Sequence, residues 1–206
     1  KHHNKGWQIA IHAQGNAANS EVITIFEELN NKLYFNNSRH RLEHCLLLPE
    51  AELSRIKKLN LFPSFHINHI LYYGEALNNS ILGEKKTSKI LPVKSALNKK
   101  IISTLHADQP MFESKPFRLI QTAVERKTKE GNIIGKNESL NLHEAIESLT
   151  INAAYQIHKE KKIGSLEKGK YADFIVLDKN PYTVKTESLH KIKCIQTFIN
   201  GNKITY

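Results

Sequence analysis

Three short apolar runs in this chain each end in a histidine or an aspartate. The apolar run in WQIAIHAQGN leads to His12, and the one in RHRLEHC leads to His44. The run in IISTLHADQP leads to Asp108, and Pro110 closes that segment. Such a run is typical of a parallel strand that is buried on both faces. In barrels of parallel strands and helices, catalytic groups lie at the carboxyl ends of the strands. Two histidines and an aspartate in these positions predict a metal site, which no single one of them would.

Helices are expected between the apolar runs, because apolar residues recur there at the spacing of an amphipathic helix. Four repeats of strand and helix predict parallel βα units and an α/β fold class. Four units are half of an eight-stranded barrel. The polar stretch 69–88 is predicted to be a long loop.

The boundaries of these elements follow from the same patterns. The first helix should bury one apolar stripe, and the last should begin with a capping box of Asn141 and Glu144. The predicted strands are 7–13, 42–48, 61–67 and the run that ends at Asp108; the predicted helices are 22–33 (stripe Val22, Ile25, Phe26, Leu29 and Leu33), 49–59, 91–98, 116–128 and the one after Asn141.

The sequence changes character after Lys162. A strand is expected at 174–177, and the runs 195–199 and 203–206 flank Asn200-Gly201. This dipeptide is typical of a two-residue type I′ hairpin turn. We therefore predict two units: 1–162, the βα region, and 163–206, a small β element.

The composition excludes several classes of protein. The net charge of +10 comes from 25 lysines and only 5 arginines, spread along the chain without an arginine-rich tract. This favours solvated lysine faces over a nucleic-acid module, although weak attraction to polyanions is left open. No apolar run approaches the roughly 18 residues of a membrane helix, so we expect neither a nucleic-acid nor a membrane partner.

Several other side chains are expected to be structural. Glu43 should pair with Arg41, and Cys45 and Cys194 should be small core residues. Tyr72 and Tyr73 are predicted to line a pocket or to pack in the core. Solvent exposure is expected for six histidines: His2, His3, His40, His143, His158 and His190.

Eight segments of the chain, in order and over nearly its whole length, resemble amidohydrolase family 3, the group that includes enzymes like N-substituted formamide deformylase. The resemblance is to the C-terminal half of such a protein. The matching segments are IHAQGNAA, RHRLEHC, PSFHINHILYYGE, LHADQP, AVERKT, EAIESLTINAAYQ, GSLEKGKYADFIVLDKNP and TFINGNKI.

The resemblance implies that the predicted strands are strands five to eight of a (β/α)8 barrel, followed by part of a small β-sandwich. It implies that His12, His44 and Asp108 bind a divalent metal, expected to be zinc, with one or two ions in the complete fold. Asp108 would also carry the proton. His69 would contact the substrate. His106, which stands beside Asp108 in the sequence, is expected to contact the substrate or to orient the aspartate. His66 lies close by, with a surface or structural role as the alternative for both His66 and His69.

Two functions are therefore carried forward. The first is a metal-dependent amidohydrolase, here a fragment, that cleaves a non-peptide C–N bond of a small amide or formamide. The second is an inactive remnant, or one half of a split amidohydrolase whose open barrel edges an N-terminal partner or a second copy covers. The family's HxH motif and metal-bridging residue would lie upstream of Lys1. So would any targeting signal, which leaves the compartment open with the cytoplasm slightly favoured.

Overall fold

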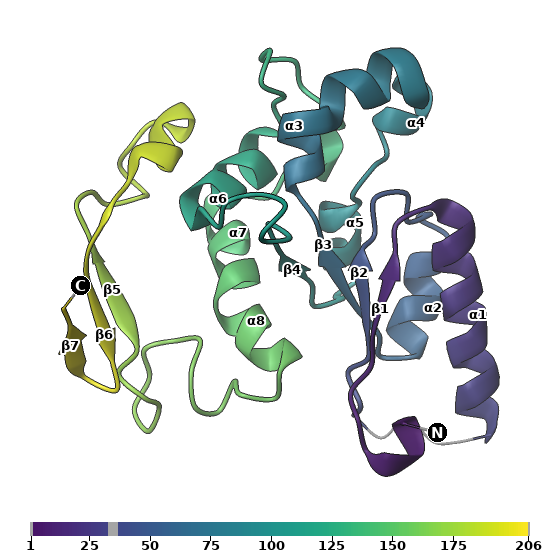
Figure 1. The fold of residues 1–206 in the computed structure, drawn as a ribbon, viewed down its shortest axis with the longest axis horizontal. Coiled ribbons are helices and arrows are strands. Elements are labelled where there is room, and N and C mark those ends of the chain that lie inside the picture. The colour runs from purple at the N-terminus through teal and green to yellow at the C-terminus, as the bar shows by residue number, and fades with distance from the viewer. Residues whose placement is uncertain (1, 33–36, 206) are drawn as a thin grey trace.

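Four parallel strands form the central sheet of the computed structural model, which describes residues 2–32 and 37–205 (Figure 1). The sheet has the order β1-β2-β3-β4, so every strand pairs with its neighbour in sequence. This confirms an α/β fold with a parallel sheet. The strands are shorter than predicted: β1 is Ala10–Ala13, β2 Arg41–His44, β3 Phe62–Phe65 and β4 Thr104–Leu105.

Helices follow each of these strands, as the sequence predicts. α1 packs beside β1 and α2, whereas α7 and α8 pack beside β4. The capping box of Asn141 and Glu144 is present at the start of α7. The α-helices are α1 Asn16–Lys32, α2 Glu52–Lys58, α3 Asn68–Ala76, α4 Glu84–Thr87, α5 Val93–Asn98, α6 Pro116–Glu125, α7 Leu142–Leu149 and α8 Ile151–Gln156; shorter turns are η1 His3–Lys5, the π-helical η2 Leu77–Ile81, η3 Lys136–Glu138 and η4 Thr186–Lys191.

The prediction of a loop at 69–88 was wrong. The segment forms most of α3, then η2 and α4. Ile70, Gly74 and Leu77 are buried, which is the spacing of one helical face. Polar residues such as Asn78, Asn79, Lys85 and Lys86 concealed this spacing in the sequence.

The first strand also differs from its prediction as a strand buried on both faces. β1 begins only at Ala10 and has β2 as its one partner among the described strands. Ala10 and His12, on one face, are exposed, whereas Ala13 is buried. Trp7, expected at the start of this strand, is 64% exposed. The open face follows from the position of β1 at the edge of the sheet.

The buried face of α1 is shifted from the predicted stripe. Ile23 and Phe26 are buried, whereas Ile25 is 47% exposed. Leu33 lies outside the described residues. The apolar pattern of this helix is broad enough to allow either face, and contact with the sheet selects the one that carries Ile23.

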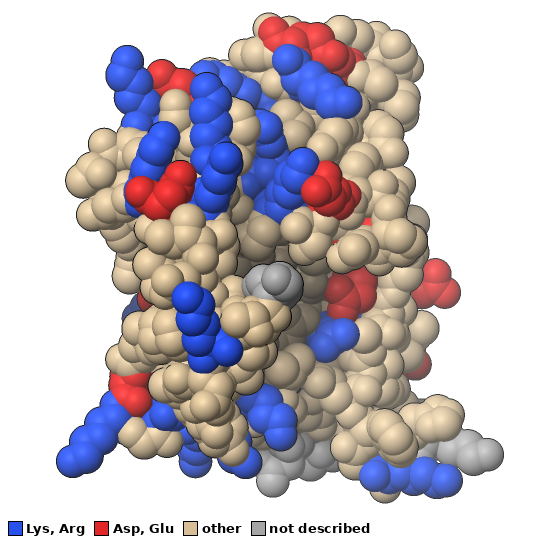
Figure 2. Space-filling view, turned by 60° about the vertical axis from the view of Figure 1, so that its left-hand side comes forward, with Lys and Arg blue, Asp and Glu red and all other residues tan. Residues whose placement is uncertain are grey.

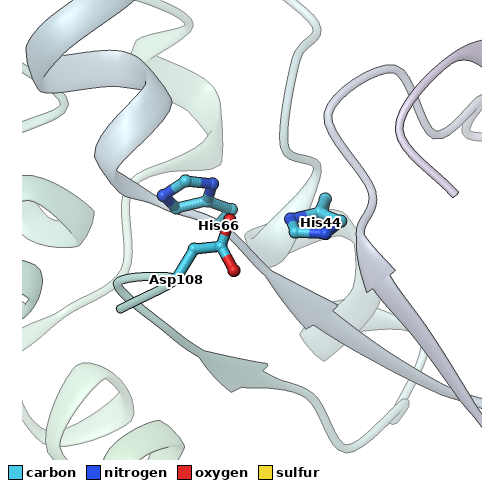
Figure 3. Close-up of side chains that lie close together, drawn as sticks. All are labelled: His44, His66 and Asp108. Carbon is cyan, nitrogen blue, oxygen red and sulfur yellow. The ribbon is translucent and has the colours of Figure 1, made fainter. Parts of the chain in front are cut away.

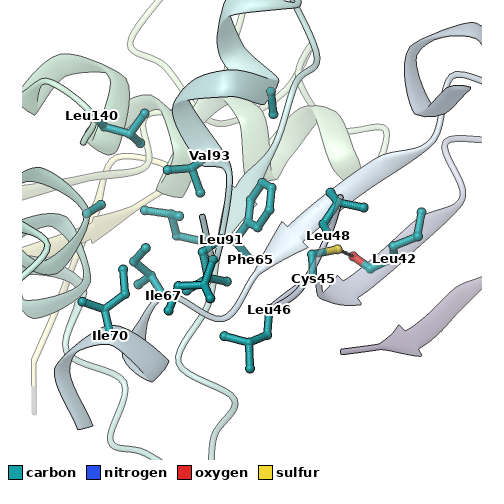
Figure 4. Close-up of a cluster of buried hydrophobic side chains, with 14 of the residues drawn as sticks. Leu42, Cys45, Leu46, Leu48, Phe65, Ile67, Ile70, Leu91, Val93 and Leu140 are labelled. Atoms are coloured by element: carbon teal, nitrogen blue, oxygen red, sulfur yellow. Dashed lines mark hydrogen bonds between the residues drawn. The ribbon is translucent and has the colours of Figure 1, made fainter. Parts of the chain in front are cut away.

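The core lies between the sheet and the helices that follow its strands, and Figure 4 shows part of it. Leu42 and Phe65 enter it from strands, and Leu91 from the segment before α5. Cys45 is fully buried, as predicted, and its thiol donates to the carbonyl of Leu42 at 3.3 Å. Cys194 is exposed, so its prediction as a core residue was wrong.

A fully buried arginine stabilises this core from the other side. The Arg126 guanidinium donates to the carbonyls of Ile134 at 2.7 Å, Ile90 at 2.8 Å and Leu91 at 3.2 Å. Burial lowers the pKa of Arg126 to about 10. The side chain therefore stays charged at neutral pH and joins three segments that are distant in sequence.

The C-terminal segment forms a separate antiparallel sheet with the order β5-β6-β7. β5 is Phe174–Leu177, β6 Cys194–Ile199 and β7 Asn202–Ile204. Asn200 and Gly201 have φ of 50° and 77°, which confirms the predicted type I′ turn. The last predicted strand ends at Ile204, and Tyr206 lies outside the described residues. η4 packs against α6, where the backbone N–H of His190 donates to Gln121 at 3.0 Å.

Charge on the surface is mixed. On the face shown in Figure 2, Lys and Arg side chains are numerous, but acidic side chains lie among them. The predicted pair of Arg41 and Glu43 is present, with Nε and Oε1 2.7 Å apart. No helix within residues 2–32 and 37–205 is long and apolar enough to cross a membrane.

Candidate metal centre

The polar residues predicted for the site gather at the carboxyl ends of the parallel strands. His44 is the last residue of β2, and His66 follows β3 directly. Asp108 lies three residues beyond β4, and His12 lies in β1. Because parallel strands all end at the same edge, these side chains approach one another although up to 96 positions separate them in sequence.

Three of these residues form a compact group of potential metal ligands. One ligand atom each of His44, His66 and Asp108 lie within 4.8 Å of one another, the only such group in the described part of the chain. In Figure 3 the Asp108 carboxylate points toward the two rings. His12 is outside this group but adjacent to it, with its ring centroid 4.4 Å from that of His44.

The structure thus brings together His44 and Asp108 from the predicted ligand set, and adds His66. The sequence offered a signal for His66, because it follows the apolar run LFPSF as the other site residues follow theirs. The resemblance drew attention to His69 instead, three residues further on.

Burial favours the neutral form of His44 and His66. Burial lowers the pKa of His66 to about 3, and the neighbouring His69, His106 and His44 add to this effect. Burial and then His12 lower the pKa of His44, whereas Asp108 opposes them. A neutral imidazole has a free lone pair, which is the form that binds a metal.

Several buried ring nitrogens have no hydrogen-bond partner within the described residues. They are Nδ1 of His44, both nitrogens of His66 and Nε2 of His106. The backbone of Ala107 acts on the pKa of His66 in the opposite direction, but it does not form a hydrogen bond of normal geometry with the ring. Unsatisfied buried nitrogens beside a carboxylate are a donor set that fits a divalent cation.

The backbone is strained at two of these strand ends. His44 and Asp108 have φ of 75° and 56°, and Cys45 has 52°. These are left-handed conformations that cost a residue with a Cβ atom about 1–2 kcal/mol. Such strain is often found at functional sites, where the surrounding fold maintains it. Here it places the two side chains at the site.

A pocket of about 430 Å³ opens beside the three residues. Six polar side chains line it, and Leu46, Leu77, Ile81 and Met111 contribute an apolar wall. Tyr73 also lines it, whereas Tyr72 stacks on Phe112. The polar residues are His12, Gln14, His44, His66, His69 and Asp108.

The two residues predicted to contact substrate lie differently. His69 lines the pocket, and its Nδ1 donates to the carbonyl of His66 at 3.0 Å. Its Nε2 is then the accepting nitrogen, 3.4 Å from the amide nitrogen of Gln14. His106 is outside the lining of this pocket and stacks on His66 at 5.0 Å between ring centroids.

Comparison with known proteins places this site in a family context. The chain is 28% identical over 196 residues to N-substituted formamide deformylase of Arthrobacter pascens, covering 95% of the chain and 36% of the relative. It is 30% identical to YtcJ of Bacillus subtilis over 205 residues, covering 96% and 37%. The chain thus spans about a third of the length of these relatives.

A solved structure agrees with the sequence relatives. An uncharacterised metal-dependent hydrolase from Pyrococcus horikoshii superposes with a TM-score of 0.74 at 26% identity, over 88% of this chain and 36% of that one. The match to the amidohydrolase family runs from residue 1 to residue 205 and so includes every strand end that contributes to the candidate metal centre. With His44, His66 and Asp108 all inside the matched region, the chain belongs to the amidohydrolase family.

Proposed function

We propose that this chain provides part of the active site of a metal-dependent hydrolase that cleaves a non-peptide C–N bond in a small amide or formamide. The observation that carries the proposal is the convergence of His12, His44, His66 and Asp108 beside one pocket. β1 to β4 would be strands five to eight of a (β/α)8 barrel. Their parallel order and the greater length of the relatives support this assignment.

His12, His44 and Asp108 would hold the divalent metal, for which zinc is the expected ion. Two imidazoles and a carboxylate match the donor types of catalytic zinc sites. When bound, such a metal polarises a carbonyl and lowers the pKa of a bound water to about 7. The unpartnered Nδ1 of His44 supports a ligand at this place.

The chain's own groups would position the substrate and move the proton. Asp108 would accept the proton of the attacking water and donate it to the leaving amine, which is general acid–base catalysis. His69, which lines the pocket, would contact the substrate, whereas His106, which stacks on His66 outside the pocket lining, would orient Asp108. The apolar wall around Leu77 and Ile81 would take an apolar substituent of the amide.

The test is hydrolysis of N-substituted formamides and simple amides by the purified, zinc-loaded chain. Asp108→Asn should lower the rate at least about 100-fold, because a general acid–base residue contributes that much or more. The matched control is Asp178→Asn, since Asp178 is an exposed residue between β5 and β6 that accepts from the N–H of Lys193. Equal rates in the two variants would contradict the role of Asp108.

A second function is favoured by the edges of the parallel sheet. In the described part of the chain, β1 pairs only with β2, and β4 only with β3. Unpaired edges are templates for another strand. The chain would then be one half of a split hydrolase, or a remnant that pairs with a second copy. Sedimentation should show an oligomer; a well-folded monomer would exclude pairing with a second copy.

A further inference from the structure

A second pocket, of about 540 Å³, lies next to the pocket of the candidate metal centre. Two segments of the chain contribute to both, because Leu47 follows Leu46 of the first pocket and Leu82 follows its Ile81. The metal ligands themselves do not line it. We call it the lysine pocket, and its lining consists of Asn16, Leu47, Leu48, Pro49, Leu82, Lys85, Lys86 and Lys89.

The charged side chains that line the lysine pocket are all positive. Lys85 and Lys86 belong to α4, Lys89 lies two residues beyond it, and all three are exposed. Like charges gathered in one place repel one another, and an anion bound among them removes that repulsion. None of the three is in an ion pair within residues 2–32 and 37–205, where the paired lysines are Lys94, Lys115, Lys127 and Lys170.

Other pockets of this protein have a different charge. Four further pockets, of about 360 to 690 Å³, each include at least one carboxylate in their lining, whereas the lysine pocket has none among the described residues. Asn16 adds the positive end of α1, a helix of 17 residues without an acidic residue in its first turn. The carboxylates of the other four are those of Glu50, Asp108, Glu125, Glu138, Asp173 and Glu187.

The rest of the lysine pocket is apolar. Leu48 is 2% exposed, and Leu47, Pro49 and Leu82 are partly buried. Pockets for small molecules combine such an apolar surface with a few charged groups that fix the orientation of the ligand. The lining supplies ammonium groups and no guanidinium, so it lacks the fork that matches a phosphate in bidentate fashion. A carboxylate needs no such fork.

We infer that the lysine pocket binds an amphipathic carboxylate, a molecule with an apolar chain or ring and one carboxylate group. The apolar part packs against Leu47, Leu48 and Leu82, and the three ammonium groups donate charge-assisted hydrogen bonds to the carboxylate. This site is distinct from the metal centre, and the inference goes beyond the proposed hydrolase function without resting on it.

The experiment is titration of the metal-free chain with octanoate by calorimetry, which should show one octanoate per chain. Octanol, which lacks the charge, and acetate, which lacks the apolar chain, should each bind at least about 10-fold more weakly. Equal affinity for octanol would show that the lysines have no role, and equal affinity for acetate that the apolar surface has none. Either result, or a folded chain that binds no octanoate, would overturn the inference.

A pair of triple variants locates the site. Replacing Lys85, Lys86 and Lys89 together by Gln should weaken octanoate binding at least about 10-fold, because three charge pairs are lost. The matched control replaces three exposed lysines outside this pocket, and it removes the same net charge. It should stay within about threefold of the native affinity, since non-specific attraction depends only on overall charge. The control positions are Lys159, Lys161 and Lys162.

Equal losses in the two triple variants would overturn the inference in favour of non-specific attraction. Octanoate binding that requires added Zn²⁺ would also overturn it, because the carboxylate would then be at the metal centre. That result would leave the proposed hydrolase function standing, whereas absent amide hydrolysis with intact octanoate binding would leave the lysine pocket standing.

A measurement on the native chain needs no variant to fold. Acetic anhydride acetylates exposed lysine amines, and mass spectrometry of the digested protein gives the extent at each position. Octanoate should slow acetylation of Lys85, Lys86 and Lys89, because a bound carboxylate covers their ammonium groups, and should leave Lys161 and Lys162 unchanged. Octanol should protect none of them. Uniform or absent protection by octanoate would decide against the site.

Discussion

The parallel and antiparallel sheets of this protein differ greatly in how much side chain they bury. All four residues of β3 are buried, whereas every residue of β5 to β7 is at least partly exposed. In the antiparallel sheet Ile175, Ile195 and Ile199 are each at least half exposed. The candidate metal centre lies entirely at the carboxyl ends of the strands of the parallel sheet.

This difference indicates where stability and function reside. Burial of apolar surface is the main stabilising contribution to folding, and buried polar groups are costly unless they are paired. Both effects are concentrated in the parallel region. Substitutions there should therefore have large effects, and substitutions in the antiparallel sheet small ones.

The largest effect is expected for Arg126→Leu. The substitution leaves the carbonyls of Ile90, Leu91 and Ile134 without their donor inside the core. Each unsatisfied buried group costs about 1–3 kcal/mol, so the free energy of unfolding should fall by roughly 3 kcal/mol or more. Urea denaturation measures this change.

The matched control is Arg55→Leu on the surface. Arg55 pairs with Glu27 at 2.6 Å and with Glu52 at 2.8 Å, and its side chain is 31% exposed. Surface ion pairs contribute about 0–1 kcal/mol. Equal losses in the two variants would show that the buried arginine has no special role.

The second-largest effect is expected from acid, which should destabilise the parallel region. His40 was predicted to be exposed, but it is buried, and burial together with His3 lowers its pKa to about 4 from 6.5. As the pH falls from 6.5 to 4, the unfolded chain binds a proton that the folded chain does not. Stability is therefore full above pH 6.5 and declines by about 3 kcal/mol over this interval.

His40→Gln isolates this contribution, because glutamine does not titrate and its carbonyl can accept from the N–H of Ile9, as Nδ1 of His40 does. Urea denaturation at pH 7 and pH 4.5 should show a smaller loss in the variant. β5 to β7 contain no histidine, so the protection of their amide protons from hydrogen exchange should change less between these two pH values. Identical pH dependence in both proteins would contradict the prediction.

Gly164→Ala should have an intermediate effect at the connection between the two regions. A Cβ at this position would lie 2.6 Å from the Cβ of Ala154 and 3.0 Å from the Cα of Ile151, and φ is +95°. Overpacking and the left-handed conformation together should cost about 2 kcal/mol or more. The thermal midpoint should fall accordingly. An unchanged midpoint would show that the predicted boundary at 162 and 163 is a loose linker.

Gly201→Ala should have the smallest effect. Gly201 also has a positive φ, +77°. The nearest atom to an added Cβ is the Cβ of Ala172 at 3.9 Å, which is an ordinary van der Waals contact. Only the conformational cost of about 1 kcal/mol remains. The comparison with Gly164→Ala by thermal denaturation separates close packing from backbone conformation, and a larger loss at Gly201 would reverse the contrast between the regions.

Local features of the fold could be predicted from the sequence. The hairpin turn at Asn200-Gly201, the capping box of Asn141 and Glu144 and strand 174–177 occur as predicted. Each depends on residues a few positions apart, whose preferred conformations are intrinsic. The helices in 69–88 and the burial of His40 were missed because both depend on contacts with distant segments.

For the candidate site, the sequence by itself determined that polar residues follow several apolar runs and that His44 and Asp108 would lie at strand ends. Which of these residues converge was decided only by the tertiary structure. The order β1-β2-β3-β4 places His66 between His44 and Asp108 and leaves His12 at the edge. The physical reason is that distances across a sheet depend on the order and spacing of its strands, which no short stretch of sequence contains.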